Sequence, residues 1–340
     1  MTEQTPPVRR VALGDTGIAI APIGLGCMGM SQSYGAADRD ESIATIRAAI
    51  DLGAGMLDTS DIYGAAGASW GNKEPVRGFG HNESLIGEAI SGRRDDIVLA
   101  TKFAALLTPD GGMTVSGRPE YVAQACDASL RRLGTDRIDL YYYHRLDPDV
   151  PIEETVGAMG ELVRSGKVRA LGLSEVSADN LRRAAAVHPI AALQSEYSLW
   201  ERGVEARIVP ACLELGVTLV PYSPLGRAML AGRFATGETF GADDYRTTIP
   251  KFSGENFDAN LKLVGQLKSF AEDRGATSGQ IALAWLLAQE VPTAPIPGTK
   301  RVSYLKENLA ALHVVLSRHD VDELAALFDP AAVQGARYGR

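Results

Sequence analysis

The chain has 340 residues, of which 45% are hydrophobic and 22% are charged, and its net charge is −8. This composition is typical of a globular protein with a sizeable core. The sequence contains no block dense in lysine and arginine, which argues against nucleic acid as a partner. Its longest apolar runs are far shorter than the ~18 residues of a membrane span, so we expect no membrane association.

The amino terminus and the cysteines favour a reducing compartment. Residues 1–10 are polar and lack the apolar stretch of a secretory signal. The cysteines Cys27, Cys126 and Cys212 are odd in number and widely spaced. That spacing fits neither a disulfide framework nor a zinc site. We therefore expect a cytoplasmic protein without a bound metal.

The first predicted elements are a hairpin and a glycine-rich strand end. Apolar residues alternate on both sides of residues 14–17, which is the pattern of a β-hairpin. The segment Gly24 to Gly29 then matches the dinucleotide-binding pattern G-x-G-x-x-G. We discount this match because residues 31–39 are mostly polar and loop-like, and because no acidic residue ends a strand ~20 residues further on. A strand-to-loop turn is the preferred interpretation.

Beyond this turn, amphipathic helices that end in glycine alternate with short apolar strands. Glycine readily takes the left-handed conformation that closes a helix. The predicted helix ends lie at or near Gly53, Gly92, Gly134, Gly166, Gly216 and Gly275. Two helix starts are indicated by capping-box patterns, Thr277-x-x-Gln280 and Asp320-x-x-Glu323.

Eight short apolar strands are predicted, counting the one that contains Ile23. The others begin at Met56, Ile97, Ile138, Ala170, Ile190, Val217 and Thr293. Strands that alternate with helices form parallel sheets. Eight such units without a linker predict a (β/α)8 TIM barrel as one domain over residues 1–340, with an N-terminal β-hairpin and a C-terminal helical extension. An open doubly wound sheet is the alternative.

Polar and aromatic residues follow the predicted strands, at the end where a barrel carries its reactive groups. These residues are Asp58, Lys102, His144, Ser174-Glu175, Gln194, Tyr222-Ser223 and Thr299-Lys300. Tyr63 stands five residues after Asp58 and can face the same cleft.

Four of these side chains together suit the protonation of an oxygen atom: Asp58, Tyr63, Lys102 and His144. A lysine ammonium lowers the pKa of a nearby tyrosine, and an aspartate holds that lysine charged and in place. A histidine can hydrogen-bond an incoming carbonyl oxygen while hydride arrives from a cofactor. The set suits a metal poorly, and Ser60 lacks the elbow motif of a nucleophile.

In order and spacing, the motifs resemble the aldo-keto reductase family from the hairpin to about Leu327. They are Leu57-Asp-Thr-Ser-Asp-Ile-Tyr-Gly64, Ala100-Thr-Lys-Phe103, Asp139-Leu-Tyr-Tyr-Tyr-His144, Gly172-Leu-Ser-Glu175, Leu193-Gln-Ser-Glu-Tyr197, Pro221-Tyr-Ser-Pro-Leu-Gly226, Ile296-Pro-Gly-Thr-Lys-Arg301 and Glu307-Asn308. The segment from Tyr197 to Trp200 is similar to that of the bacterial and plant branch.

The resemblance implies a catalytic role for each matching residue. Tyr63 would donate the proton and Lys102 would lower its pKa. Asp58 would anchor Lys102, and His144 would orient the carbonyl group. The expected activity is the NADPH-dependent reduction of a small-molecule aldehyde or ketone.

The resemblance also implies a cofactor site. Tyr222 would stack on the nicotinamide, and Ser174 and Gln194 would bind its carboxamide. The pyrophosphate path would be lined by Ser223, Leu225 and Arg227. The segment Gly298, Thr299, Lys300 and Arg301 would meet the adenosine end, where the two cations suit a 2′-phosphate and so favour NADPH over NADH. Glu307 and Asn308 would hold the adenine.

Three features depart from the family pattern. Glu175 stands where asparagine is frequent, so a contact from its side chain to the carboxamide is not expected. Tyr304 stands where many members carry an arginine against the 2′-phosphate. Residues 65–81 form a longer connection than this branch usually has, which is either a flap over the substrate or a surface insertion. A second long stretch, residues 231–258, is expected to close over the cofactor.

Two other functions are kept as alternatives. Members of this fold family also serve as nicotinamide-nucleotide-sensing regulatory subunits with little turnover. An open-sheet dehydrogenase that uses Gly24 to Gly29 is the weaker alternative. Among substrates, aldehydes, ketones, sugars, pyridoxal-like compounds and polyketide carbonyls all fit the sequence, and any oligomeric state is compatible with it.

Overall fold

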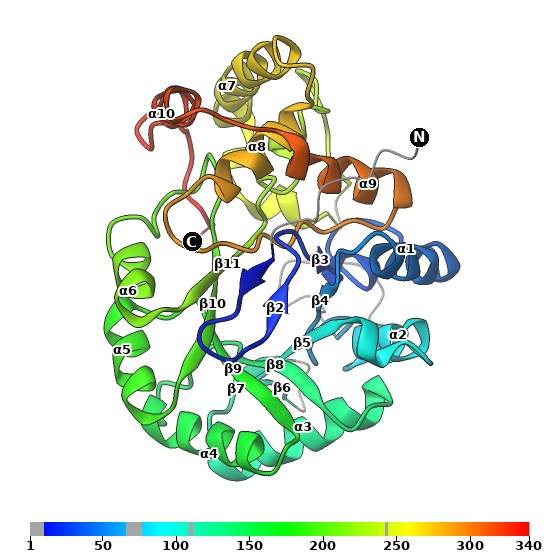
Figure 1. The fold of residues 1–340 in the computed structure, drawn as a ribbon. Helices are drawn as coiled ribbons and strands as arrows, with labels where there is room; N and C mark the ends of the chain where they lie inside the picture. The colour runs from blue at the N-terminus through cyan, green and yellow to red at the C-terminus, as the bar shows by residue number, and fades with distance from the viewer. Residues whose placement is uncertain (1–9, 66–76, 109–111, 242–243, 340) are drawn as a thin grey trace, which may run out of the picture.

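The computed structural model describes residues 10–65, 77–108, 112–241 and 244–339. Its main sheet has seven parallel strands in the order β11-β10-β9-β8-β5-β4-β3, arranged as a ring in Figure 1. The strands are β3 (Leu25–Gly26), β4 (Met56–Asp58), β5 (Val98–Phe103), β8 (Ile138–Tyr143), β9 (Val168–Ser174), β10 (Ile190–Glu196) and β11 (Thr218–Tyr222).

The segment 293–298 closes the ring between β11 and β3. Leu219 forms a parallel bridge with Thr293, and Gly26 forms another with Gly298. The N–H of Ile296 also donates to the carbonyl of Pro221 at 3.0 Å. This segment is the eighth strand of the sequence prediction. The (β/α)8 barrel is therefore confirmed, and the open-sheet alternative is wrong.

The predicted hairpin covers the amino ends of the barrel strands. Its strands are β1 (Val11–Ala12) and β2 (Ala19–Ile20), which pair antiparallel and cross the centre of the ring in Figure 1. The side chains of Leu13, Ile18 and Ile20 pack against inward-facing barrel residues such as Met56 and Leu140. The barrel interior is thus a filled core with one end sealed, and only the carboxyl ends of the strands can carry a site.

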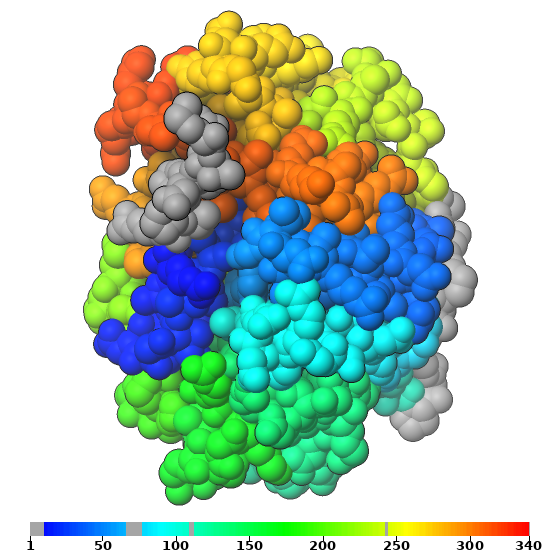
Figure 2. Space-filling model, turned by 45° about the vertical axis from the view of Figure 1, so that its right-hand side comes forward, coloured from blue at the N-terminus to red at the C-terminus, as the bar shows by residue number. Residues whose placement is uncertain are grey.

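Helices surround the barrel. They are α1 (Arg39–Asp51), α2 (His81–Ala89), α3 (Pro119–Leu133), α4 (Ile152–Arg164), α5 (Ala178–Val187), α6 (Ile208–Leu215), α8 (Ser278–Leu287) and α9 (Val302–Ala310). Two further helices lie at the top of Figure 1: α7 (Gly254–Glu272), which precedes α8, and α10 (Arg318–Leu327), which forms the C-terminal extension. In the space-filling view, α1 lies between α2 and α9 on the surface (Figure 2). No helix in the described ranges is long and apolar enough to span a membrane.

Short 3-10 helices complete the secondary structure in the connections. They are η1 (Met28–Met30), η3 (Arg94–Asp96), η4 (Met229–Ala231), η5 (Tyr245–Thr248), η6 (Pro250–Phe252) and η7 (Ala311–His313). A small hairpin of β6 (Ala105–Leu107) and β7 (Met113–Val115) follows β5, and the sequence analysis did not predict it.

Local helix signals were largely correct. All six glycines predicted at helix ends have positive φ angles. The capping box of Thr277 and Gln280 is confirmed at α8. The second capping-box prediction is wrong by one turn: Ser317 is the N-cap of α10, and the carboxylate of Asp320 accepts its N–H at 2.8 Å. Asp320 therefore fills the third position of the box rather than the first.

The glycine pattern of residues 24–29 serves barrel closure. It leads into η1 and not into an α-helix. A Cβ atom at Gly26 would lie 2.8 Å from the carbonyl oxygen of Ile296, closer than real Cβ atoms come. Only glycine lets the backbone of β3 approach the eighth strand so closely, and the pattern is not a dinucleotide fingerprint here.

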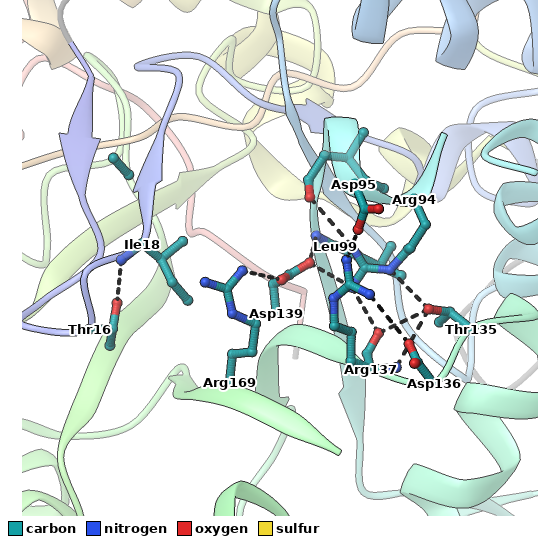
Figure 3. A network of polar contacts seen from close by, with 12 residues as sticks. Thr16, Ile18, Arg94, Asp95, Leu99, Thr135, Asp136, Arg137, Asp139 and Arg169 are labelled. Carbon is teal, nitrogen blue, oxygen red and sulfur yellow. Dashed lines mark hydrogen bonds and ion pairs between the residues drawn. The ribbon is translucent and has the colours of Figure 1, made fainter. Parts of the chain in front are cut away.

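A buried carboxylate joins three strands at the amino end of the barrel. Asp139 of β8 accepts the N–H of Leu99 on β5 at 2.9 Å and the guanidinium of Arg94 at 2.7 Å through the same oxygen. Its other oxygen accepts from Arg169 of β9 at 2.8 Å. Figure 3 shows these side chains converging on Asp139. Because both oxygens are used, we assign Asp139 to stability rather than to chemistry.

Replacing Asp139 with alanine should therefore destabilise the fold. Breaking a buried ion pair leaves its partner uncompensated, at a cost of about 3 kcal/mol. Urea titration followed by circular dichroism measures this loss. The exposed neighbour Asp136 provides the matched control, since its Ala variant removes a charge from the turn just before β8 and should change stability little. Equal stability of the two variants would contradict the assignment.

Candidate active site

The mouth of the barrel contains a buried chain of three groups from β4, β5 and the turn between them. Asp58 pairs with Ala100 across the strands, and Lys102 stands two residues further on the same face of β5. The ammonium of Lys102 donates to Asp58 at 2.6 Å, to the carbonyl of Thr59 at 2.8 Å and to the hydroxyl of Tyr63 at 3.0 Å. All three of its donors are therefore used.

Burial and charge set the protonation of this chain. Burial, the largest single effect, would lower the pKa of Lys102, but Asp58 and then Tyr63 together outweigh it and the pKa is raised. Burial raises the pKa of the Tyr63 phenol, and the charge of Lys102 reduces that rise without reversing it. Lys102 therefore lowers the pKa of Tyr63 as predicted. The effect of burial is larger, so the pKa of Tyr63 ends above its ordinary value. At neutral pH, Lys102 is charged and Tyr63 keeps its proton.

His144 lies directly after β8, edge-on to the Tyr63 ring at a centroid distance of 6.0 Å. Its Nδ1 atom lies 3.1 Å from the hydroxyl oxygen of Ser60. Burial, and then the positive charges of Arg145 and Lys102, hold the pKa of His144 well below its usual value. The imidazole is therefore neutral. Sequence reasoning considered Ser60 only as a nucleophile and missed this contact, although its place between Asp58 and Tyr63 could have suggested it.

Asp61 extends the hydrogen bonding of His144 and Ser60 towards the protein interior. Its Oδ1 atom accepts from Ser60 at 3.2 Å, while its fully buried Oδ2 atom has no hydrogen-bond partner within the described ranges. The neighbouring carboxylate of Glu83 pairs with Arg132 at 2.6 Å. Burial, and then the charge of Glu83, raise the pKa of Asp61 well above its usual value.

The residues predicted to bind a carboxamide lie at the ends of β9 and β10. The Nε2 atom of Gln194 donates to the second oxygen of Asp58 at 2.7 Å. The hydroxyl of Ser174 accepts from Nη1 of Arg145 at 3.1 Å. Both side chains are buried, and Gln194 contacts the Asp58–Lys102–Tyr63 chain directly.

The C-terminal segment, residues 334–339, reaches the same rim. The guanidinium of Arg337 donates at 2.8 Å to Glu175, to Glu196 and to the hydroxyl of Tyr222. Tyr338 adds a hydroxyl contact to Tyr222 at 2.8 Å. The unusual Glu175 thus has a structural explanation, since its carboxylate holds the C-terminal segment and also accepts the N–H of Glu196. Sequence reasoning missed Arg337.

The turn after β11 has an unusual backbone. Ser223, Arg227 and Ala228 all have positive φ angles, which non-glycine residues adopt rarely and mostly at functional sites. In the described part of the chain, the backbone N–H groups of Leu225 and Arg227 have no acceptor. The N–H of Gly226 between them donates to the carbonyl of Ser223 at 2.8 Å. Free N–H groups in such a turn can bind an anion.

The long stretch after this turn folds over the barrel mouth. Phe234, Phe240, Phe252 and Phe257 pack together. The N–H of Tyr245 donates to the carbonyl of Ser33 at 3.3 Å. The guanidinium of Arg227 donates to the hydroxyl of Tyr34 at 3.2 Å and to Glu196 at 3.3 Å. The loops that follow β3 and β11, the two strands that flank the eighth, therefore meet beside the turn that follows β11.

The predicted adenosine-binding residues lie around the start of α9. Lys300 donates to the carbonyls of Tyr34, Gly35 and Ala36, so it ties down the first of these two loops. Arg301 is exposed, and its nearest carboxylate is Glu41 at 3.9 Å. Next to it lie the exposed Gly298 and the half-buried Thr299, whose hydroxyl accepts the N–H of Arg301 at 3.1 Å.

The far end of this region is built from α8 and α9. Glu307 pairs with Arg233 and accepts from Thr277 at 3.1 Å. Arg233 also lies over the ring of Tyr304, 3.9 Å from its centroid. Asn308 is buried. Tyr304, the second departure from the family pattern, thus provides a face for a neighbouring cation rather than a charge of its own.

The predicted insertion at residues 65–81 falls largely on residues 66–76, which lie outside the described residues. Of its aromatic residues, Phe79 is described and packs against the small apolar cluster that contains Tyr63. This contact brings the end of the insertion beside the buried chain.

Comparison with known proteins identifies the family. The family model described as the aldo/keto reductase family matches residues 22–329. The chain belongs to this family and is therefore an oxidoreductase of the carbonyl-reducing kind. It is 43% identical over 338 residues to "Aldo-keto reductase yakc [NADP(+)]" of Schizosaccharomyces pombe, a match that covers 98% of this chain and 94% of the relative.

Solved structures agree with this assignment. A glycerol dehydrogenase from Gluconobacter oxydans, AKR11B4, is similar with a TM-score of 0.84 and 26% identity over 95% of this chain and 97% of its own. An aldo/keto reductase from Klebsiella pneumoniae, solved with NADP and acetate, has a TM-score of 0.71 and 29% identity over 97% and 99% of the two chains. All three of these relatives are named as enzymes.

Asp61 generates a prediction for stability. A carboxyl whose pKa is raised on folding favours the fold below its unfolded pKa, and this advantage is lost as the pH rises. Asp61→Asn should remove the penalty while keeping an acceptor for Ser60, and should raise the melting temperature at pH 7 by about 2 °C or more. The difference between the variant and the natural chain should shrink as the pH falls towards about 4. Thermal melts across pH test this, and a less stable variant at pH 7 would contradict it.

Proposed function

We propose that the protein is a cytoplasmic, NADPH-dependent reductase of the CH–OH class that converts a small aldehyde or ketone to an alcohol on a single barrel domain. The observation that carries the proposal is the Asp58–Lys102–Tyr63 chain at the barrel mouth. The NADP in the names of the fission-yeast and Klebsiella relatives supports the choice of cofactor. The three buried free cysteines support a reducing compartment.

The residues at the mouth fit a dinucleotide phosphate. The free N–H groups of the turn at 223–228 suit a pyrophosphate, and the exposed Arg301 suits a 2′-phosphate. Tyr222 offers a ring for the nicotinamide, and Ser174 and Gln194 offer polar groups for its carboxamide. Lys300 acts indirectly, because its ammonium already holds residues 34–36. NADPH supplies the hydride when bound.

The adenine end of the cofactor is assigned to the last predicted pair. Glu307, fixed by Arg233 and Thr277, and the buried Asn308 would bind the base. Leu225 packs against Ile23 and Leu283, so it would shape the pyrophosphate path through its backbone rather than through its side chain.

Tyr63 holds the proton that the substrate oxygen needs. Its raised pKa keeps it protonated in the free enzyme, and the Lys102 ammonium at 3.0 Å stabilises the phenolate that forms when the proton leaves. Asp58 keeps Lys102 charged and in position. Asp58 therefore acts on the substrate only through Lys102.

His144 would bind the carbonyl oxygen through Nε2. A neutral imidazole carries one proton, and the partner of one nitrogen decides which nitrogen holds it. If Ser60 donates to Nδ1, the proton stays on Nε2, where it can meet the substrate. The Ser60 hydroxyl has two acceptors within reach, Nδ1 of His144 at 3.1 Å and Oδ1 of Asp61 at 3.2 Å, so its orientation sets the tautomer of His144.

The central prediction concerns Tyr63. Tyr63→Phe removes the acidic hydrogen and little else, so kcat for aldehyde reduction should fall by about 10²–10⁴-fold, while NADPH binding measured by fluorescence changes little. Asp58→Asn should reduce kcat less, since Lys102 keeps its contact with Thr59. Turnover of Tyr63→Phe near the natural level would refute the proposed role. A larger loss in Asp58→Asn would mean that the two roles are exchanged.

Arg301 should govern the choice between NADPH and NADH. Arg301→Gln removes the exposed cation, so the preference for NADPH should fall by roughly tenfold, as expected for a charged hydrogen bond. Steady-state kinetics with both cofactors measure the ratio. Arg318→Gln on α10 is the control, because it removes a comparable surface charge at a distance. An unchanged ratio in Arg301→Gln would show that the 2′-phosphate binds elsewhere.

A further inference from the structure

Arg145 is a fixed cation beside the proposed reaction centre. It directly follows His144 at the end of β8 and is half-buried. Its Nη1 atom donates to the carbonyl of His144 at 2.7 Å and to the hydroxyl of Ser174 at 3.1 Å. These two bonds hold the planar guanidinium at the rim between β8 and β9. Its charge also influences the titration of Tyr63 and of Glu175, which agrees with this position.

The cations nearest to the Asp58–Lys102–Tyr63 chain and to Tyr222 have carboxylate partners. Lys102 pairs with Asp58, Arg227 with Glu196, and Arg337 with both Glu175 and Glu196. Arg145 forms no ion pair with any carboxylate in the described ranges, and within them its Nε and Nη2 atoms donate to nothing. A half-buried charge that lacks a counter-ion is costly. The cost is offset when a ligand brings the missing negative charge.

The geometry of the free Nε and Nη2 atoms indicates which kind of anion Arg145 would bind. Nε and Nη2 lie in one plane and point in parallel, which matches the two oxygens of a carboxylate. Because Arg145 is next to His144, an anion bound there lies close to the carbonyl that His144 would orient. We propose that the preferred substrates are carbonyl compounds that carry a carboxylate, and that Arg145 binds this group. The inference rests on the proposed reductase function and adds the substrate class to it.

The test compares matched substrates. The three carboxybenzaldehyde isomers vary the distance between the anion and the carbonyl, and the methylbenzaldehydes of the same substitution are the neutral controls. In the natural chain, kcat/KM for at least one acid should exceed that of its methyl counterpart by about tenfold or more. The gain should come mainly from a lower KM, because the carboxylate binds in the ground state as well.

Variants connect the preference to Arg145. Arg145→Gln keeps a donor for Ser174 but loses the charge, and should reduce the ratio of acid to neutral kcat/KM by about tenfold or more. Using the ratio removes any loss that affects both substrates equally. Arg145→Lys keeps the charge and should retain part of the preference. The control Arg131→Met removes the same charge from the exposed face of α3 and should leave the ratio unchanged.

The outcomes separate the two proposals. If the natural chain reduces neither acid nor neutral aldehyde, the reductase function fails. If it reduces both and the ratio is near one, or is unchanged in Arg145→Gln, the reductase function stands and the carboxylate inference is overturned. A preference for glyceraldehyde 3-phosphate over glyceraldehyde without any gain for the acids would also overturn it. Thermal melts of each variant confirm that the kinetics are measured on folded protein.

Discussion

The buried ion pair of Lys102 and Asp58 is the interaction on which the site depends. Placing two charges in the barrel interior costs several kcal/mol per ion in desolvation, so the pair persists only where every remaining donor and acceptor is used. Thr59 accepts the second hydrogen of Lys102, and Gln194 donates to the second oxygen of Asp58. The four residues come from three barrel strands and one turn. The charge pair can therefore form only when the barrel strands pair in the observed register.

Burial presets the protonation of the groups around this pair. Tyr63 keeps its proton and His144 remains neutral, because a low-polarity surrounding disfavours the phenolate and the imidazolium alike. The barrel mouth thus combines a fixed ammonium with two neutral hydrogen-bond donors. Such an arrangement already complements an oxygen that becomes negative, and it needs little rearrangement during the reaction.

The barrel and the rim were predictable because they follow local patterns. Strand length, glycine at helix ends and the polar residue after each strand are read within a few residues, and they placed Asp58, Lys102 and His144 at one rim. The contacts that were missed are non-local. Nothing near Arg337 indicates that it meets Glu175, and nothing near Lys300 indicates that it holds the carbonyls of residues 34–36. Such pairs depend on how side chains pack in three dimensions, and periodicity carries no information about them.

The C-terminal segment gives the site an order of assembly. The contacts of Lys102 with Asp58 and Tyr63 span 44 and 39 residues, whereas those of Arg337 with Tyr222 and Glu175 span 115 and 162. Longer loops cost more entropy to close, and contacts of high sequence separation form slowly. A refolding chain can therefore bring Lys102, Asp58 and Tyr63 together first. The contact of Gln194 with Asp58 spans 136 residues, so the charge pair gains its last partner at the stage when the rim around Tyr222 also closes.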